Sequence, residues 1–178
     1  GQQVRKGEKL GQMGHTGMTE FPHLHFSLRK NNIVIDPFTG LPTGDCKVKG
    51  RQMWDSPLFY EPVKIFATGF ADKSMDVEPI LDDASSPTTL ATNSDGLLFW
   101  AIIYGVKAGD TISLKVHGPR AGLFVDFSET LEKNKIRYFR GIGRKHGAQP
   151  FEAGQYRGEI VVKRGTLQRK AVNFVTLK

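Results

Sequence analysis

Residues 97–104 read Leu97-Leu98-Phe99-Trp100-Ala101-Ile102-Ile103-Tyr104 and form the longest apolar run of the chain. This run is far too short to span a bilayer, because a membrane-spanning helix needs about 20 apolar residues. It is also short for a helix, whereas a fully buried β-strand often has this length and this continuous apolar character. We therefore predict that residues 97–104 form a buried strand.

Further strands are predicted on both sides of this run. Thr111–Val116 alternates cleanly and places Ile112, Leu114 and Val116 on one face. The other predicted strands are residues 63–70, 123–127, 136–140, 156–162 and 170–175, with a hairpin turn at 164–167. About seven short strands over ~115 residues are typical of an Ig-like sandwich. We predict an all-β chain in which residues 61–178 form an Ig-like β-sandwich domain.

Tyr156 is a candidate for a specific device of such sandwiches. Gly154-Gln155-Tyr156 precedes the strand Glu159–Val162. The arrangement resembles a tyrosine corner, in which the ring hydroxyl ties down a crossing loop. The alternative is that Tyr156 is an ordinary aromatic residue of the core.

Composition and charge limit the partners. The chain has 178 residues, of which 39% are hydrophobic and 24% are charged. This length is sufficient for one ordinary domain or for one and a half small domains. The formal net charge of +7 would suit nucleic acid, a membrane surface or an anionic cell wall. However, Lys and Arg are spread along the chain and interleaved with acids. We interpret most of these basic residues as parts of solvated surfaces. We predict no nucleic-acid partner and no transmembrane segment in this chain. A wall polymer is compatible with the charge.

Residues 41–60 are rich in turn-forming residues and are predicted to be a linker. Trp54, Phe59 and Tyr60 are costly to leave in water, so we expect this linker to pack on its neighbours. Cys46 is the only cysteine, and no disulfide can therefore close within this sequence. We interpret it as a small turn residue, and a pairing with a cysteine outside this sequence is the alternative.

The histidines of Pro22-His23-Leu24-His25-Phe26 are the candidate chemical groups. Read as a strand, this stretch sends His23 and His25 to one face and Leu24 and Phe26 to the other. The two imidazoles would stand about 7 Å apart, so that one could bind a metal while the other reached a water or substrate beside it. The alternative is a pair of surface histidines on an edge strand.

The residues around the histidines carry further motifs in order. These are Val4, Gly7, Leu10, Gly11, Gly14 and Thr16-Gly17 upstream, then Pro22–Phe26, then Asp36-Pro37. In pattern and spacing they resemble the C-terminal part of the LytM/lysostaphin-like zinc metallopeptidases: V-x-x-G-x-x-(I/L)-G-x-x-G-x-T-G, P-H-L-H-F and D-P. The resemblance covers about residues 1–40, which we predict to be the C-terminal part of such a peptidase domain.

The resemblance implies a site and a substrate. It makes His25 a zinc ligand and His23 a catalytic histidine that handles protons or steadies the transition state. His15, at a variable position of the G-x-T-G loop, is expected near the mouth of the site and close to substrate. The implied cofactor is Zn²⁺, the substrate is peptidoglycan, and the location is the periplasm or the extracellular envelope of a bacterium.

The sequence also departs from the family. The upstream H-x-x-x-D that supplies the other zinc ligands does not occur in these 178 residues. A catalytic zinc normally needs three protein ligands, so we predict that this chain alone is inactive. The chain is then a fragment of a zinc-dependent metalloendopeptidase acting on peptidoglycan cross-link peptides, with an accessory β-sandwich. The alternative is a non-enzymatic wall-binding or scaffold protein with a degenerate peptidase domain, and a carrier domain is a weaker third reading.

The tail carries a second, weaker resemblance. Ig-like modules that follow peptidase domains of this family often show a G-D at a strand start, a G-R-K turn and a G-x-Y-x-G. Here these are Gly109-Asp110, Gly143-Arg144-Lys145 and Gly154–Gly158. Their order agrees with the predicted Ig-like domain.

Overall fold

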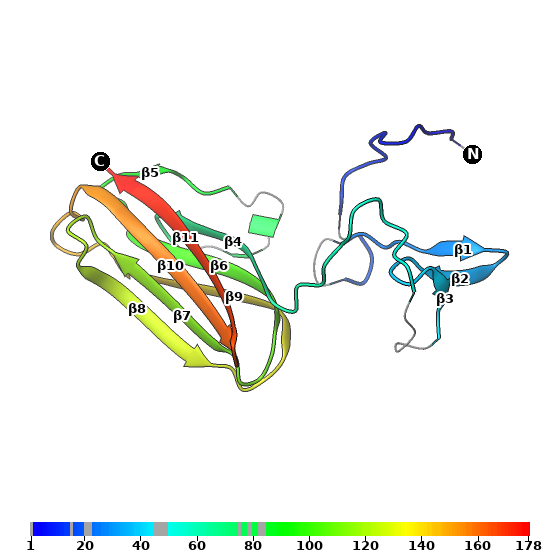
Figure 1. Ribbon diagram of the computed structural model, residues 1–178. Coiled ribbons are helices and arrows are strands. Elements are labelled where there is room, and N and C mark those ends of the chain that lie inside the picture. Colours follow the sequence, from blue (N-terminus) through cyan, green and yellow to red (C-terminus); the bar gives the residue numbers. More distant parts are fainter. Residues whose placement is uncertain are drawn as a thin grey trace. The chain divides into compact units, whose positions relative to one another are not determined.

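The computed structural model describes residues 2–14, 16–19, 23–44, 50–74, 76–77, 80–81 and 85–178. Apart from the helical residues Ile80 and Leu81, the regular structure in these ranges is all β-strand, and the predicted all-β class is confirmed. No helix in the described ranges is long and apolar enough to cross a membrane. The chain divides into two compact units, the N-terminal unit Gly1–Tyr60 and the C-terminal unit Glu61–Lys178 (Figure 1).

The N-terminal unit contains a small antiparallel sheet. Its strands are β1 (Leu28–Lys30), β2 (Ile33–Asp36) and β3 (Leu41–Pro42), in the order β1-β2-β3. Asn31 and Asn32 connect β1 to β2 with φ values of 50° and 64°, as a two-residue hairpin turn requires. In the described part of this unit, Ile35 is the only buried hydrophobic residue.

The histidine stretch is not a strand, and this prediction is wrong. Residues 23–27 have no strand assignment, and β1 begins only at Leu28. A strand needs a partner for its backbone groups, and in the described part of the chain no strand pairs with residues 23–27. The His23 amide instead donates to the Gly14 carbonyl at 3.3 Å.

Residues of the predicted linker 41–60 belong to the N-terminal unit. The Trp54 ring lies 5.8 Å from the Phe26 ring and 5.8 Å from the Phe38 ring, measured between centroids. Phe59 and Tyr60 are exposed. Trp54 therefore packs as the sequence predicts, whereas these two aromatic residues do not. Cys46 lies outside the described residues.

The C-terminal unit is a sandwich of two sheets (Figure 1). One sheet has the order β4-β6-β9, with β4 at Lys64–Ala71, β6 at Gly96–Val106 and β9 at Lys135–Lys145. The other has the order β5-β11-β10-β7-β8, with β5 at Thr89–Leu90, β11 at Leu167–Leu177, β10 at Gly154–Arg164, β7 at Thr111–His117 and β8 at Leu123–Thr130. Each of the seven predicted strands is present. The sequence missed β5, which has only two residues and runs parallel to β11.

The core lies between the inward faces of the two sheets. Alternate residues of the strands supply it, including Phe70, Phe99, Ile103, Ile112, Leu114, Ile160 and Val162, all fully or almost fully buried. Gly158 is required by this packing, because a β-carbon there would lie 2.3 Å from the Phe99 ring. The predicted β-sandwich is therefore present.

The run at residues 97–104 is buried on both faces of its sheet. Phe99 faces the main core, whereas Trp100 and Ile102 face the opposite side. There they form a second apolar cluster with Ile80 and Ala71. Burial on both faces explains why the run is continuously apolar rather than alternating.

Tyr156 forms the predicted tyrosine corner. Its ring is buried, and its hydroxyl donates to the Glu152 carbonyl oxygen at 3.1 Å. Burial is the main cause that raises the pKa of the phenol. Tyr156 is therefore more than an ordinary aromatic residue of the core, because its hydroxyl also holds the loop before β10.

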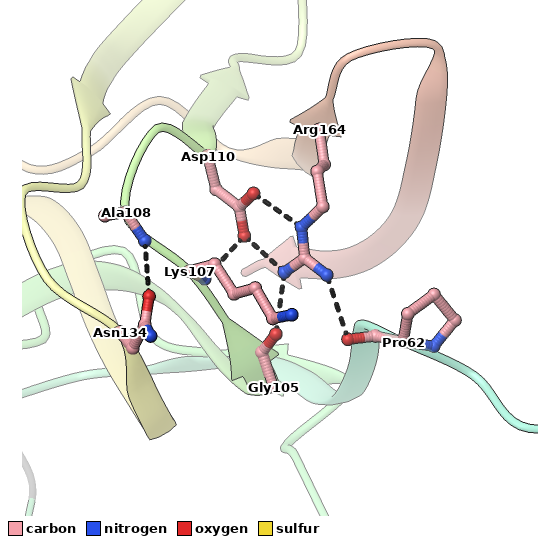
Figure 2. Close-up of polar contacts among 7 residues, drawn as sticks. All are labelled: Pro62, Gly105, Lys107, Ala108, Asp110, Asn134 and Arg164. Atoms are coloured by element: carbon pink, nitrogen blue, oxygen red, sulfur yellow. Dashed lines mark hydrogen bonds and ion pairs between the residues drawn. The ribbon is translucent and has the colours of Figure 1, made fainter. Parts of the chain in front are cut away.

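A buried ion pair closes one end of the sandwich (Figure 2). Arg164 donates from Nε to Asp110 Oδ1 at 2.7 Å and from Nη2 to Oδ2 at 2.7 Å. The same guanidinium donates to the carbonyl oxygens of Pro62 at 3.2 Å and Gly105 at 2.7 Å. The Asp110 carboxylate also accepts from the Lys107 amide at 2.8 Å. One pair thus joins the segment before β4, the end of β6, the β6–β7 turn and the β10–β11 hairpin.

Removing either charge of this pair should be strongly destabilising. Asp110 is 1% exposed, so Arg164→Leu would leave a buried carboxylate without its partner. We expect Arg164→Leu and Asp110→Asn each to lower the free energy of unfolding by about 3–5 kcal/mol, measured by urea denaturation. The double variant should cost clearly less than the sum, because the two changes remove one shared interaction. Asp126→Asn, an exposed control, should change stability by less than about 0.5 kcal/mol.

The pair also predicts an acid sensitivity. Hydrogen bonds from Arg164 hold the pKa of Asp110 below its ordinary value of 3.8. A carboxylate with a lowered folded-state pKa stabilises the fold above its ordinary pKa, and this contribution is lost as the pH falls below about 3.8. Asp110→Asn should lack this part of the pH dependence. An unchanged acid limb in Asp110→Asn, or additive effects in the double variant, would contradict the role of the pair.

Candidate functional site

The candidate site lies in the segment before β1. His23 and His25 are both exposed. Thr19 Oγ1 lies 3.0 Å from His23 Nδ1, a hydrogen bond that orients this ring. The sequence did not predict this contact, for which the only signal was a hydroxyl residue four positions before the histidine. His15 lies outside the described residues, so its expected place near substrate stays a prediction.

Apolar side chains of the chain ahead of β1 are also exposed. Leu24 is 78% exposed and Leu10 is 80% exposed. Phe26 contacts Trp54 and remains more than half exposed. The described residues therefore bury little of the apolar surface of this segment, in contrast to the closed core of the C-terminal unit.

The carboxylate of Asp36, in the D-P motif, shapes the end of this small sheet. It accepts the Phe38 amide at 2.8 Å and the Thr39 hydroxyl at 3.3 Å. The Gly40 amide donates to the Asp36 carbonyl at 2.7 Å. Asp36 thus acts as a turn former between β2 and β3, and these contacts explain an aspartate at this position.

The described residues do not by themselves fit a zinc ion. Among them, no group of three or more His, Cys, Asp and Glu side chains could hold a metal. His25 offers one imidazole, and a zinc site takes three or four protein ligands. His117 and His146 belong to the C-terminal unit, where His117 Nδ1 and His146 Nε2 are buried. The structure therefore does not bring a complete donor set around His25 within the described ranges.

Comparison with known proteins gives a family match for part of the chain and structural likenesses to solved proteins. Residues 1–37 match the model of Peptidase family M23. The crystal structure of the CARDB domain of the PF1109 protein from Pyrococcus furiosus, in complex with di-metal ions, is similar at 13% identity and a TM-score of 0.40. The likeness covers 69% of this chain and 95% of that one. No curated protein matches the chain.

The incomplete donor set leads to a measurable expectation. The 178-residue chain, dialysed after zinc loading, should retain well below one zinc per monomer, because one strand-flanking imidazole with His23 beside it binds zinc weakly. Elemental analysis combined with a mass measurement of the particle tests this. One tightly held zinc per monomer would contradict the expectation and would require ligands other than those identified above.

Proposed function

We propose that this chain is part of a zinc-dependent metalloendopeptidase that cleaves the cross-link peptides of bacterial peptidoglycan. The observation that carries the proposal is the match of residues 1–37 to Peptidase family M23, whose members are generally zinc-dependent. The P-H-L-H-F stretch lies inside the matched range. Such an enzyme would act in the periplasm or outside the cell, where its substrate is.

Two histidines receive different roles in this proposal. His25 is assigned as a zinc ligand, and further ligands would have to come from outside the described residues. His23 is assigned to proton transfer or to stabilising the developing negative charge. The hydrogen bond between Thr19 and His23 supports this second role, because an imidazole that is held in one orientation needs less reorganisation to reach a reacting group.

The C-terminal unit is proposed to be an accessory domain of the same protein. Its sandwich has its own core and its own buried ion pair, so it can hold its shape without the histidine segment. The excess of basic residues in the chain suits an anionic wall polymer as partner.

The histidine assignments are tested in the full-length product of the encoding gene. His25→Ala should lose both bound zinc and turnover of peptidoglycan peptides, because it removes a ligand. His23→Ala should keep its zinc but turn over about 10²–10⁴-fold more slowly, because only the acid–base or charge-stabilising group is lost. Zinc content by elemental analysis and peptide release by chromatography are measured on the same samples.

The controls separate chemistry from folding. Both histidines are exposed, so the circular dichroism spectra of the variants should match the parent. Zinc retained in His25→Ala, or full turnover in His23→Ala, would mean that the two roles are assigned wrongly. A zinc-loaded parent that releases no peptide would instead favour the non-enzymatic scaffold.

A further inference from the structure

The outward face of the five-stranded sheet carries a polar groove. In β7, Ile112, Leu114 and Val116 are buried, so the alternate residues of this strand face outward. The strands β7, β10 and β11 lie side by side (Figure 1). On their outward face is a cavity of about 210 Å³, lined by Ser113, Lys115, Glu159, Val161, Lys163 and Gln168.

The strand register sets the order of groups in the groove. Lys115 is opposite Glu159, and Lys163 lies between Thr111 and Gln168 on its two neighbouring strands. In the next row Ser113 is opposite Val161, which pairs with Lys170. Because these positions follow directly from backbone pairing, the rigid sheet holds the groups at fixed spacings without help from any loop.

Cations exceed carboxylates on this face, since Lys115, Arg157, Lys163 and Lys170 stand against Glu159 and against Asp126, which lies opposite Lys115 on β8. Glu159 is already neutralised, since Lys170 Nζ lies 3.0 Å from its Oε2 and Arg157 donates to the same oxygen. Burial would raise the pKa of Glu159, but hydrogen bonds from Lys170 and Arg157 outweigh it and lower the pKa, so the group stays ionised. Lys115 and Lys163 are exposed and make no ion pair with a carboxylate of the described residues.

The groove also offers groups that recognise hydroxyls. Ser113 Oγ lies 3.0 Å from Ser128 Oγ, and the exposed Gln168 amide can donate and accept. Phe174, 46% exposed and opposite Arg157, gives a neighbouring apolar surface. Ammonium groups at the rim, with a serine and an amide beside them, suit a polymer that carries both carboxylates and hydroxyls.

The central carboxylate argues against a nucleic acid in this groove. A phosphate backbone carries closely spaced negative charges, and Glu159 would lie directly beneath it. Single-stranded nucleic acids also need several aromatic stacking platforms, whereas Phe174 is the exposed aromatic residue of the outward face in β10 and β11. Carboxylates that are widely spaced along a polysaccharide can bind Lys115 and Lys163 without lying above Glu159.

We propose that the outward face of β7, β10 and β11 binds a carboxylate-bearing polysaccharide through Lys115, Lys163 and Gln168. This binding role is separate from the proposed peptidase chemistry and requires neither zinc nor the histidine segment. It would give the C-terminal unit the task of holding the chain on an acidic, hydroxyl-rich polymer.

The test uses the 178-residue chain in affinity gel electrophoresis, with hyaluronate, which carries a carboxylate on every second sugar, as the acidic polysaccharide, dextran as the neutral one and single-stranded DNA as the competing polyanion. The chain should be retarded by hyaluronate and not by dextran. Lys115→Gln/Lys163→Gln should weaken this binding about tenfold. The control Lys133→Gln/Lys178→Gln removes the same charge from exposed positions elsewhere and should change binding less than twofold.

An uncharged variant distinguishes recognition from general attraction to a basic protein. Gln168→Ala should weaken hyaluronate binding about threefold, because a hydrogen-bonding group is lost at constant net charge. Gln149→Ala, at another exposed glutamine, should have no effect. Equal losses in the groove and control lysine pairs, equal retardation by dextran, or tighter binding to DNA than to hyaluronate would each overturn the proposal. Circular dichroism confirms that all the variants are folded.

Discussion

The C-terminal unit depends on the buried carboxylate of Asp110, which accepts hydrogen bonds from Arg164 and from the Lys107 amide of the same unit. Asp110 is 1% exposed, and its charge is balanced by Arg164, 54 residues later in the chain. Leaving such a carboxylate unpaired in the interior costs several kcal/mol. The conformation in which Arg164 reaches Asp110, Gly105 and Pro62 together is therefore strongly preferred. This arrangement fixes both sheets at one end, and Tyr156 fixes the loop before β10.

The strands β8 and β9 belong to different sheets, and contacts between their side chains join them in place of backbone pairing. The guanidinium of Arg140 lies 3.9 Å from the centroid of the Phe127 ring, and that of Arg144 lies 4.9 Å from the Phe124 ring. These contacts join β9 of one sheet to β8 of the other. The basic residues of the chain thus divide into those that pack within the fold and those, such as Lys115 and Lys163, that remain available to a partner.

The sequence predicted what depends on local pattern and missed what depends on distant residues. Alternation at Thr111–Val116 and the apolar run at 97–104 correctly indicated strands, since side-chain periodicity reflects which faces are buried. In the sequence, Gly109-Asp110 is only a motif at the start of a strand. Its role needs the β10–β11 hairpin to bring Arg164 close, and no short-range signal reports that contact. The histidine stretch has the alternation of a strand, but alternation alone does not supply a pairing partner.

The C-terminal unit satisfies its own backbone groups and buried charges, whereas residues 23–27 of the N-terminal unit pair with no strand of the described chain. Amide hydrogen exchange of the 178-residue chain, followed by mass spectrometry, measures this difference. We expect slow exchange in β6, β7 and β10, close to the limit set by global unfolding, and nearly unprotected exchange at residues 23–27. Protection of residues 23–27 equal to that of β6, or rapid exchange throughout β6, β7 and β10, would contradict it.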